Sequence, residues 1–301
     1  MEIWVFITIA AAFLQNIRSM LQKHLKASMG TTAATFVRFG FGLPFALVFV
    51  AFLHFVMAYP VPAPGAAFFG WVVLGGLTQI IATFLLLYIF GFRNFVVGTA
   101  YSRTEPAQAA VFSVLFLGEH SAAGTLIAIA ISVIGVMFIS VARSATGIRS
   151  LLTSVFSRTA AAGIASGTAF GIAAVAYRAA SLSLGYPGYL MQAAVTLLAT
   201  ISFQTAIMLA WLYWRERGEF ARIRSAWKIS AIVGLVGATA SFGWFTAMTL
   251  QQSAVVKALA QIEILFTIAT SILFFHEKIN RLELAGSALI IAGILSLLYV
   301  G

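Results

Sequence analysis

Long apolar segments follow one another along the whole chain, separated by short stretches rich in polar, Gly and Pro residues. A helix needs about 20 apolar residues to cross a bilayer. This pattern predicts ten spans, over residues 3–22, 32–57, 66–90, 95–118, 122–142, 159–184, 188–213, 228–250, 254–276 and 281–300. The segments show little alternation with a period of two residues, which argues against a membrane barrel. The predicted fold is therefore an all-α polytopic membrane protein.

The composition supports this class and narrows the chemistry. The chain is 61% hydrophobic and 9% charged, well outside the range of soluble domains. It contains no Cys and no Asp, and its four His residues show no metal-binding spacing. We therefore expect no metal site, no cofactor and no enzyme activity. An intramembrane enzyme acting on lipid-linked substrates is a remote alternative, because no nucleophile or metal set is evident.

The basic residues indicate the orientation in the membrane. Thirteen of the eighteen lie in the loops after the first, third, fifth, seventh and ninth predicted spans, or at the adjoining span ends: Lys23, Lys26, Arg93, Arg143, Arg149, Arg158, Arg215, Arg217, Arg222, Arg224, Lys228, Lys278 and Arg281. The opposite loops and both termini carry none. The positive-inside rule predicts that both termini face outward. This placement also explains the net charge of +10 without a nucleic-acid partner.

The two halves of the chain repeat one another at an offset of 158 residues. The clearest matches are Glu105 with Glu263, each inside an apolar run, and Glu119 with Glu277, fourteen residues further on. Each half contains five predicted spans, so the second half enters the membrane from the opposite side. We predict a first repeat over 1–142, a basic cytoplasmic linker over 143–158 and a second repeat over 159–301, the two repeats being inverted around a central cavity.

The two glutamates are predicted to lie at the membrane midplane. Glu105 is ten residues into its predicted span and Glu263 is nine, which corresponds to roughly 15 Å of helix, half of the hydrocarbon thickness. An ionised carboxylate there is costly, and taking up a proton removes that cost. A residue that gains and loses a proton in two alternating states would couple transport to protons. The alternative is a structural pair with a neighbouring basic residue.

Five basic residues lie inside predicted spans: Arg18, Arg38, Arg103, Arg178 and Lys257. Lys257 and Gln261 are four residues apart and share a helix face. Together with Arg103, whose repeat mate is Gln261, they would bind a carboxylate or phosphate group of a substrate. The alternative is an internal ion-pair network. Five bases against two acids favour zwitterionic or anionic solutes over organic cations.

Further residues are candidates for packing or for the wall of a cavity. Gln79 adds a polar group to the third predicted span, while Tyr101 and Trp244 would supply aromatic surface; lipid-facing or packing positions are the alternative. Three glycines at four-residue spacing lie in the sixth predicted span: Gly163, Gly167 and Gly171. Such a ridge permits close helix packing. A hinge is the sharper alternative for these glycines.

Two segments resemble landmarks of the EamA domain: TEPAQAAVFSVLFLGE, which contains Glu105, and IEILFTIATSILFFHEKI, which contains Glu263. Arg38, in FVRFGFGLP, matches an arginine common in the second helix of that domain. Over nearly its full length the chain resembles the ten-helix carriers of the drug/metabolite transporter superfamily. The resemblance implies two inverted five-helix repeats, with the fourth and ninth helices lining the cavity. The second copy departs from the pattern, with Ile264 where the first copy has Pro106.

We therefore expect a secondary transporter, an exporter or exchanger, of small organic metabolites such as amino acids, in a bacterial cytoplasmic (inner) membrane. It would work by alternating access, either coupled to H⁺ through the glutamates or without ion coupling. No Walker motif is present for direct use of ATP. Multidrug or organic-cation efflux is the alternative function. The expected partners are the small-molecule substrate, H⁺ and membrane lipid, and the chain would be a monomer or homodimer.

Overall fold

A computed structural model describes residues 2–89, 95–142, 157–185, 188–275 and 280–300. Within these ranges every regular element is a helix, which confirms the predicted all-α class. The chain forms two compact units, Met1–Ile80 with Ala176–Gln251, and Ile81–Val175 with Gln252–Gly301. Each unit therefore takes helices from both halves of the sequence.

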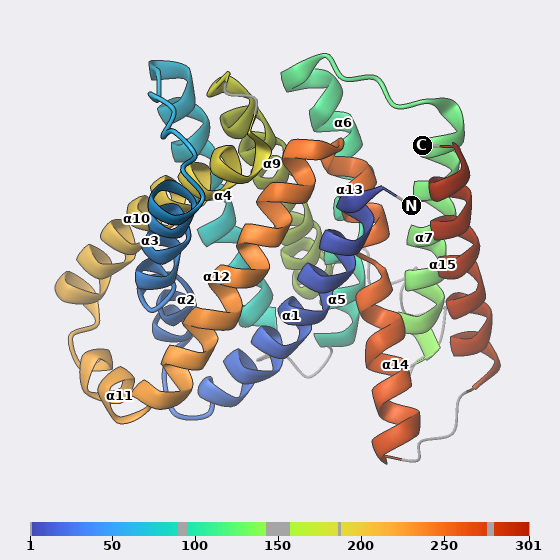
Figure 1. Ribbon diagram of the computed structural model, residues 1–301. Coiled ribbons are helices and arrows are strands. Elements are labelled where there is room, and N and C mark those ends of the chain that lie inside the picture. Colours follow the sequence, from blue (N-terminus) through green and yellow to red (C-terminus); the bar gives the residue numbers. More distant parts are fainter. Residues whose placement is uncertain (1, 90–94, 143–156, 186–187, 276–279, 301) are drawn as a thin grey trace. The chain divides into compact units, whose positions relative to one another are not determined.

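The first unit contains α1 (Ile3–Leu25), α2 (Thr31–Gly40), α3 (Leu43–Ala51), the π-helical turn η1 (Phe52–Val56), the first part of α4 (Ala66–Ile89), the end of α9 (Arg158–Ser183), α10 (Tyr189–Arg215), α11 (Glu219–Ser225) and α12 (Trp227–Leu250). Helix α1 lies along α12, and α10 packs against α2, α3 and α12 (Figure 1). Elements from the two halves of the sequence thus interlock within this unit.

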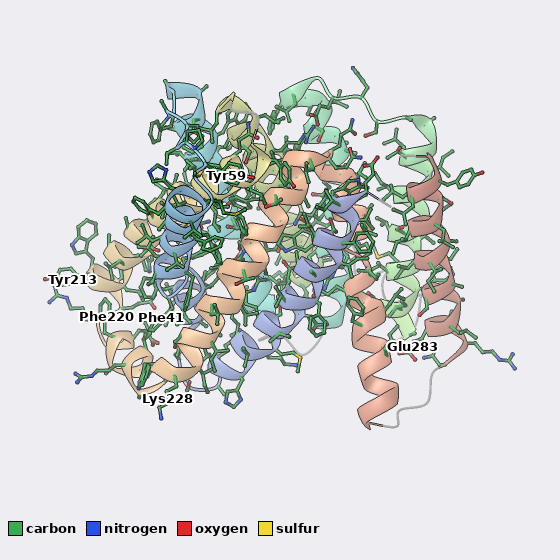
Figure 2. All side chains as sticks on the ribbon, viewed as in Figure 1. Phe41, Tyr59, Tyr213, Phe220, Lys228 and Glu283 are labelled. Atoms are coloured by element: carbon green, nitrogen blue, oxygen red, sulfur yellow. The ribbon has the colours of Figure 1, made fainter. Side chains whose placement is uncertain are left out.

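Five basic residues of the first unit gather near α11. Lys228 lies at this end of the unit, whereas Tyr59 lies in its other half (Figure 2). Four further basic residues belong to the same stretch between α10 and α12: Arg215, Arg217, Arg222 and Arg224. This clustering is what the positive-inside rule requires of one membrane face. Which face is cytoplasmic stays a prediction.

The second unit contains the end of α4, α5 (Phe95–Ser102), α6 (Glu105–Leu117), α7 (Ala123–Ala142), most of α9, α13 (Ser253–Leu259), α14 (Ile262–Phe275) and α15 (Arg281–Val300). Helices α7 and α15 pack along each other (Figure 1). A Cβ on Gly135 would lie 2.7 Å from the carbonyl oxygen of Gly286, and a Cβ on Gly286 would lie 2.6 Å from that of Gly135. Glycine at both positions allows the two backbones to touch.

Eight helical segments of the described ranges are long and apolar enough to cross a membrane. Their helix ends agree with the predicted spans to within three residues. The second predicted span is divided among α2, α3 and η1. Pro44, in the first turn of α3, lacks an N–H and crowds the carbonyl four residues earlier, so a single straight helix is disfavoured there.

The predictions of single continuous helices over 95–118 and 254–276 are wrong. The first is broken at Arg103 and Thr104, between α5 and α6, and the second at Ala260 and Gln261, between α13 and α14. Pro106 explains the first break, because it cannot donate a helical hydrogen bond. No proline marks the second break. The repeat mates Arg103 and Gln261 both lie in the breaks.

Short-range backbone bonds close both breaks. In the first, the backbone N–H of Thr104 donates to the carbonyl of Tyr101 at 3.2 Å. In the second, the N–H of Glu263 donates to the carbonyl of Ala260 at 3.1 Å. These bonds join residues three apart, as in a 3₁₀ turn. Each predicted span is thus two half-helices joined by a tight turn.

The predicted repeats 1–142 and 159–301 and the linker 143–158 stay predictions. Most of the linker lies outside the described residues, as do Arg93, Glu277 and Lys278. The division into two units follows different boundaries, which fall inside α4, inside α9 and between α12 and α13. Each compact unit is therefore made of elements from both predicted repeats.

Candidate transport site

The glycine ridge of α9 passes along the first helix break. Its members are Gly163, Gly167 and Gly171. A Cβ on the first would meet the backbone of Gly98 in α5, and a Cβ on the second would lie 2.9 Å from the carbonyl oxygen of Ser102. A Cβ on the third would lie 3.5 Å from the carbonyl oxygen of Glu105. The ridge therefore supports both half-helices on either side of the break, and the packing interpretation is confirmed.

One ion pair joins the two breaks. The Nη1 of Arg103 donates a hydrogen bond to Oε2 of Glu263 at 3.0 Å. The side chain of Arg103 is 34% exposed and that of Glu263 is 8% exposed. The Nε2 of Gln261 also donates to the carbonyl oxygen of Arg103 at 3.1 Å. Both the side chain and the backbone of Arg103 are thus held by the second half of the sequence.

A second ion pair lies between Lys257 on α13 and Glu105 at the start of α6. The Nζ of Lys257 is 2.8 Å from Oε1 of Glu105, with side-chain exposures of 13% and 18%. The direction of approach does not make a hydrogen bond, and this buried Oε1 accepts none within the described part of the chain. The contact is therefore mainly a charge contact, in contrast to the aligned bond of Arg103.

The pairing is reciprocal between the two halves of the sequence. Glu105 contacts a base of the second half, and Glu263 contacts a base of the first half. The two acids and two bases sum to zero formal charge. A buried pair tolerates its low-dielectric surroundings only while both partners are present, because removal of one leaves an uncompensated charge. The ion-pair alternative left open by the sequence thus describes the same residues as the proposed site.

The backbone of the breaks also stabilises these charges. Glu105 is the first residue of α6 and Glu263 is the second residue of α14. A carboxylate at a helix N-terminus is favoured by the exposed N–H groups and the helix dipole. The half-helices therefore offset part of the cost of placing two acids inside apolar runs.

Three residues around the first break complete its hydrogen bonding. The Oγ1 of Thr104 donates to the carbonyl oxygen of Tyr101 at 2.7 Å, and the Nε2 of Gln108 donates to Oγ1 of Thr104 at 2.7 Å. Thr104 and Gln108 were not among the predicted site residues. Their four-residue spacing around Glu-Pro was the available signal, since it places both on one side of a helix start. Tyr101, predicted as a cavity wall, contributes its carbonyl here.

The remaining predicted site residues lie in the first unit. Arg178 donates through Nη1 to the carbonyl oxygens of Met248 at 2.7 Å, Thr249 at 3.4 Å and Gln251 at 2.8 Å. These carbonyls end α12, where a cation satisfies both their hydrogen bonding and the helix dipole. This geometry gives Arg178 a structural contact, while a role with substrate stays a prediction.

Gln79 belongs to a buried network of the first unit. Its Oε1 accepts hydrogen bonds from the Tyr177 hydroxyl and from Nε2 of Gln204, each at 2.8 Å. The Tyr177 ring packs against that of Phe245 with the centroids 4.3 Å apart and the planes tilted by 31°. Trp244, the predicted aromatic wall, is buried on α12 beside Phe245 in sequence. Gln79 thereby links α4 to α9 and α10 within this unit.

Arg18 and Arg38 are also buried in the first unit, each 4% exposed. A Cβ on Gly237 would lie 3.3 Å from Cδ of Arg18 and 3.6 Å from Cγ of Arg38, so both arginines pass beside this glycine of α12. The three glutamates of the unit lie near helix ends: Glu2, Glu216 and Glu219. The predicted surplus of three intramembrane bases therefore belongs to the first unit: Arg18, Arg38 and Arg178.

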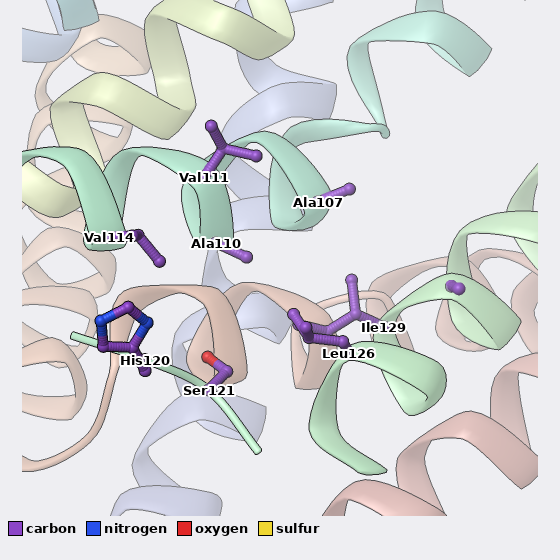
Figure 3. Close-up of a pocket in the computed structure, with 9 residues that line it drawn as sticks. Ala107, Ala110, Val111, Val114, His120, Ser121, Leu126 and Ile129 are labelled. Carbon is purple, nitrogen blue, oxygen red and sulfur yellow. The ribbon is translucent and has the colours of Figure 1, made fainter. Parts of the chain in front are cut away.

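A separate pocket of about 270 Å³ lies between α6 and α7 of the second unit (Figure 3). Its lining is mostly aliphatic, with His120 and Ser121 contributed by the connecting loop. The remaining lining residues are Ala107, Ala110, Val111, Val114, Leu126, Ile129 and Ala130. None of the paired charges lines it. This pocket is therefore not the charged site.

These observations define a class: a helical membrane protein with a duplicated sequence and ion pairs at two helix breaks. The model of the EamA-like transporter family matches residues 2–141 and 157–299. The chain belongs to the EamA-like transporter family, in two copies, as the sequence resemblance indicated. It is therefore a multi-pass membrane protein of a family that transports small molecules. This membership agrees with the expectation that the chain is not an enzyme.

Comparison with solved structures supports the fold. One of them, described as "Crystal structure of protein", superposes with a TM-score of 0.66 at 14% sequence identity. The match covers 97% of this chain and 99% of the other. At this identity the likeness shows a shared fold alone. No curated protein matches the chain.

Proposed function

We propose that the chain is a secondary transporter, an exporter or exchanger, of small organic metabolites such as amino acids. The single observation that carries this proposal is the reciprocal ion pairing at two helix breaks in a member of a transporter family. Discontinuous helices and intramembrane charges are typical of the substrate and ion sites of inverted-repeat transporters. Alternating access would expose these groups to each side of the membrane in turn.

Coupling to protons is the mechanism we propose for the glutamates. Protonation of either acid removes the charge that balances its base, so the two protonation states favour different arrangements of the site. Such a difference in free energy is what a driving ion must supply to a carrier. The rival mechanism is a facilitator or exchanger in which both pairs stay ionised throughout.

A flux experiment tests transport and coupling together. A screen of amino acids, nucleosides and organic acids for thermal stabilisation would first supply a ligand, because binding to the native state raises apparent stability. Flux of that compound in liposomes, with and without a pH gradient, is then compared among wild type, Glu105→Gln and Glu263→Gln. We expect wild-type flux to respond to the gradient. If both variants respond as the wild type does, the coupling role is wrong.

Multidrug efflux is the second candidate function, and the ion pairing of both glutamates at the helix breaks disfavours it. A carrier of organic cations would need an acid available to the substrate, whereas both glutamates of the helix breaks contact bases. Zwitterionic or anionic solutes suit the site better, since an anionic group can replace a glutamate beside Arg103 or Lys257, and the ammonium of a zwitterion can pair with the displaced glutamate. A resistance profile across cationic dyes would separate the two functions, and broad dye resistance would favour efflux.

The cellular setting is proposed from loop charge. We place the protein in a bacterial cytoplasmic membrane with both termini outside, as a monomer or homodimer in contact with lipid. The cluster of basic residues between α10 and α12 would then be cytoplasmic. Alkaline phosphatase fused to the C-terminus should be active; an inactive fusion beside an active cytoplasmic reporter would reverse this topology.

A further inference from the structure

We propose that the two ion pairs have different roles, which deepens the proposed function and rests on it. Glu105, paired with Lys257, is the residue that takes up and releases the proton. Arg103 and Glu263 stay ionised throughout and hold the two helix breaks together. The repeat supplies two equivalent acids, but the bases that face them are not equivalent.

The two bases, Arg103 and Lys257, differ in their chemistry. A guanidinium keeps its proton under all physiological conditions and holds a carboxylate through directed N–H groups. The Arg103 bond to Glu263 has this directed form, at 3.0 Å. An ammonium on a flexible stem is a point charge that can move away from its partner. The Lys257 contact with Glu105 is close but not aligned as a hydrogen bond.

The two pairs also differ in the number of contacts that link the breaks. Arg103 is held twice, through its side chain by Glu263 and through its carbonyl oxygen by Gln261. Movement of Arg103 would therefore disrupt contacts to both residues. The side chain of Glu105 contacts the second half of the sequence through its ion pair with Lys257. Separation of this pair disturbs less of the structure.

The two carboxylates also differ in how accessible they are to a proton. The side chain of Glu105 is 18% exposed, whereas that of Glu263 is 8% exposed. A proton arriving through water reaches the more exposed carboxylate more readily. When Glu105 becomes neutral, Lys257 remains as a cation in a site where it is only 13% exposed. Loss of the Glu105 charge from this pair favours movement of Lys257 or binding of an anionic group beside it.

The other charges around Glu105 are few. Lys257 faces it from α13, and Arg103 and Glu263 lie at the adjoining breaks. Tyr101 is the one titratable residue of α5, and α7 carries none. The part of α9 in the second unit carries only Arg158, at its first residue. Proton exchange at Glu105 is therefore balanced chiefly by Lys257.

Infrared difference spectroscopy between acid and neutral pH tests this assignment without any substrate. Protein in lipid vesicles is compared for wild type and two double variants, Glu105→Gln/Lys257→Gln and Arg103→Gln/Glu263→Gln. Each variant removes one whole pair, so no buried charge is left behind and folding is preserved. Size-exclusion chromatography and thermal unfolding confirm that each remains folded.

Because the chain contains eight glutamates, we expect one component band of the protonated-carboxyl absorption to disappear in Glu105→Gln/Lys257→Gln and to persist in Arg103→Gln/Glu263→Gln. Loss of the band only in the Arg103/Glu263 variant, or its persistence in both, would overturn the assignment. The spectrum reports protonation and not flux. A chain that transports by facilitation would carry the compound in liposomes without a response to the pH gradient and would fail the infrared test, so transport itself and this assignment fail separately.

Discussion

The two units treat buried charge in opposite ways. In the second unit, two acids and two bases from both halves of the sequence form reciprocal pairs at two helix breaks. In the first unit, Arg18 and Arg38 are buried, and Arg178 donates to backbone carbonyls at the end of α12. A base inside a span can therefore bind the carbonyls of a helix end as well as balance an acid. A site that can switch needs partners whose charge can change.

Of the substitutions that test the difference between the two units, disruption of the glycine ridge should have the largest effect, on the yield of folded protein. We expect Gly167→Leu to abolish folding, because a side chain there would overlap the backbone of Ser102 at the end of α5. The measurement is the yield of monodisperse protein on size-exclusion chromatography. Gly70→Leu is the matched control, since a Cβ on this helical glycine meets nothing within 4 Å. Equal yields of the two variants would contradict the packing of α9 along the break.

Removal of one partner from a pair should have the next largest effect. We expect Glu105→Gln to lower the free energy of unfolding by about 3 kcal/mol, because Lys257 then lacks its counter-charge. Glu105→Gln/Lys257→Gln should recover most of this loss. A double-mutant cycle by denaturant unfolding gives the coupling between the residues. Additive losses would show that the two side chains do not interact.

Loss of the Arg178 cap should have a smaller effect, confined to stability. We expect Arg178→Met to lower the free energy of unfolding by about 1.5–3 kcal/mol, as for hydrogen bonds to a charged group. Flux per folded molecule should persist, because the hydrogen bonds of the Arg178 Nη1 are to the carbonyls at the end of α12. Exposed Arg224→Met is the control for lost positive charge. A selective loss of substrate binding in Arg178→Met would instead place it in the site.

Pro106→Ala should have the smallest effect and compares the two breaks directly. The second break forms with Ile264 at the equivalent position, so a proline is not required. We expect the variant to lose less than about 1 kcal/mol, chiefly through the greater freedom of its unfolded chain. Circular dichroism should show unchanged helix content. A clear gain in helicity with a rise in Tm would mean that proline alone imposes the first break.

Hydropathy located the spans because lipid forces every backbone group to bond within its own helix, and apolar length then sets the helix ends. Glu105 and Glu263 lie beside the two breaks, where continuous helices were predicted. Their partners could not be predicted, because Arg103 and Lys257 occupy different positions in the two copies. The pairing depends on helices brought together by tertiary packing.

Only one of the two breaks has a clear signal in the sequence. Pro106 signals a helix start, whereas the turn at Ala260 and Gln261 lies in residues of ordinary helical propensity. There the side-chain amide of Gln261 bonds to the carbonyl of Arg103, a contact between residues 158 apart in sequence. Such long-range stabilisation overrides local propensity. Arg178 was selected for the same reason that Arg103 was, yet its contacts are with carbonyls.

The most direct test of the central claim is proton-driven flux in liposomes for the two pair-removal variants. With a compound that stabilises the wild type, we expect a pH gradient to accelerate flux in the wild type and in Arg103→Gln/Glu263→Gln, even where the absolute rate falls. In Glu105→Gln/Lys257→Gln, flux should no longer respond to the gradient. A full response in this variant, with the response lost in the Arg103/Glu263 variant, would contradict the account.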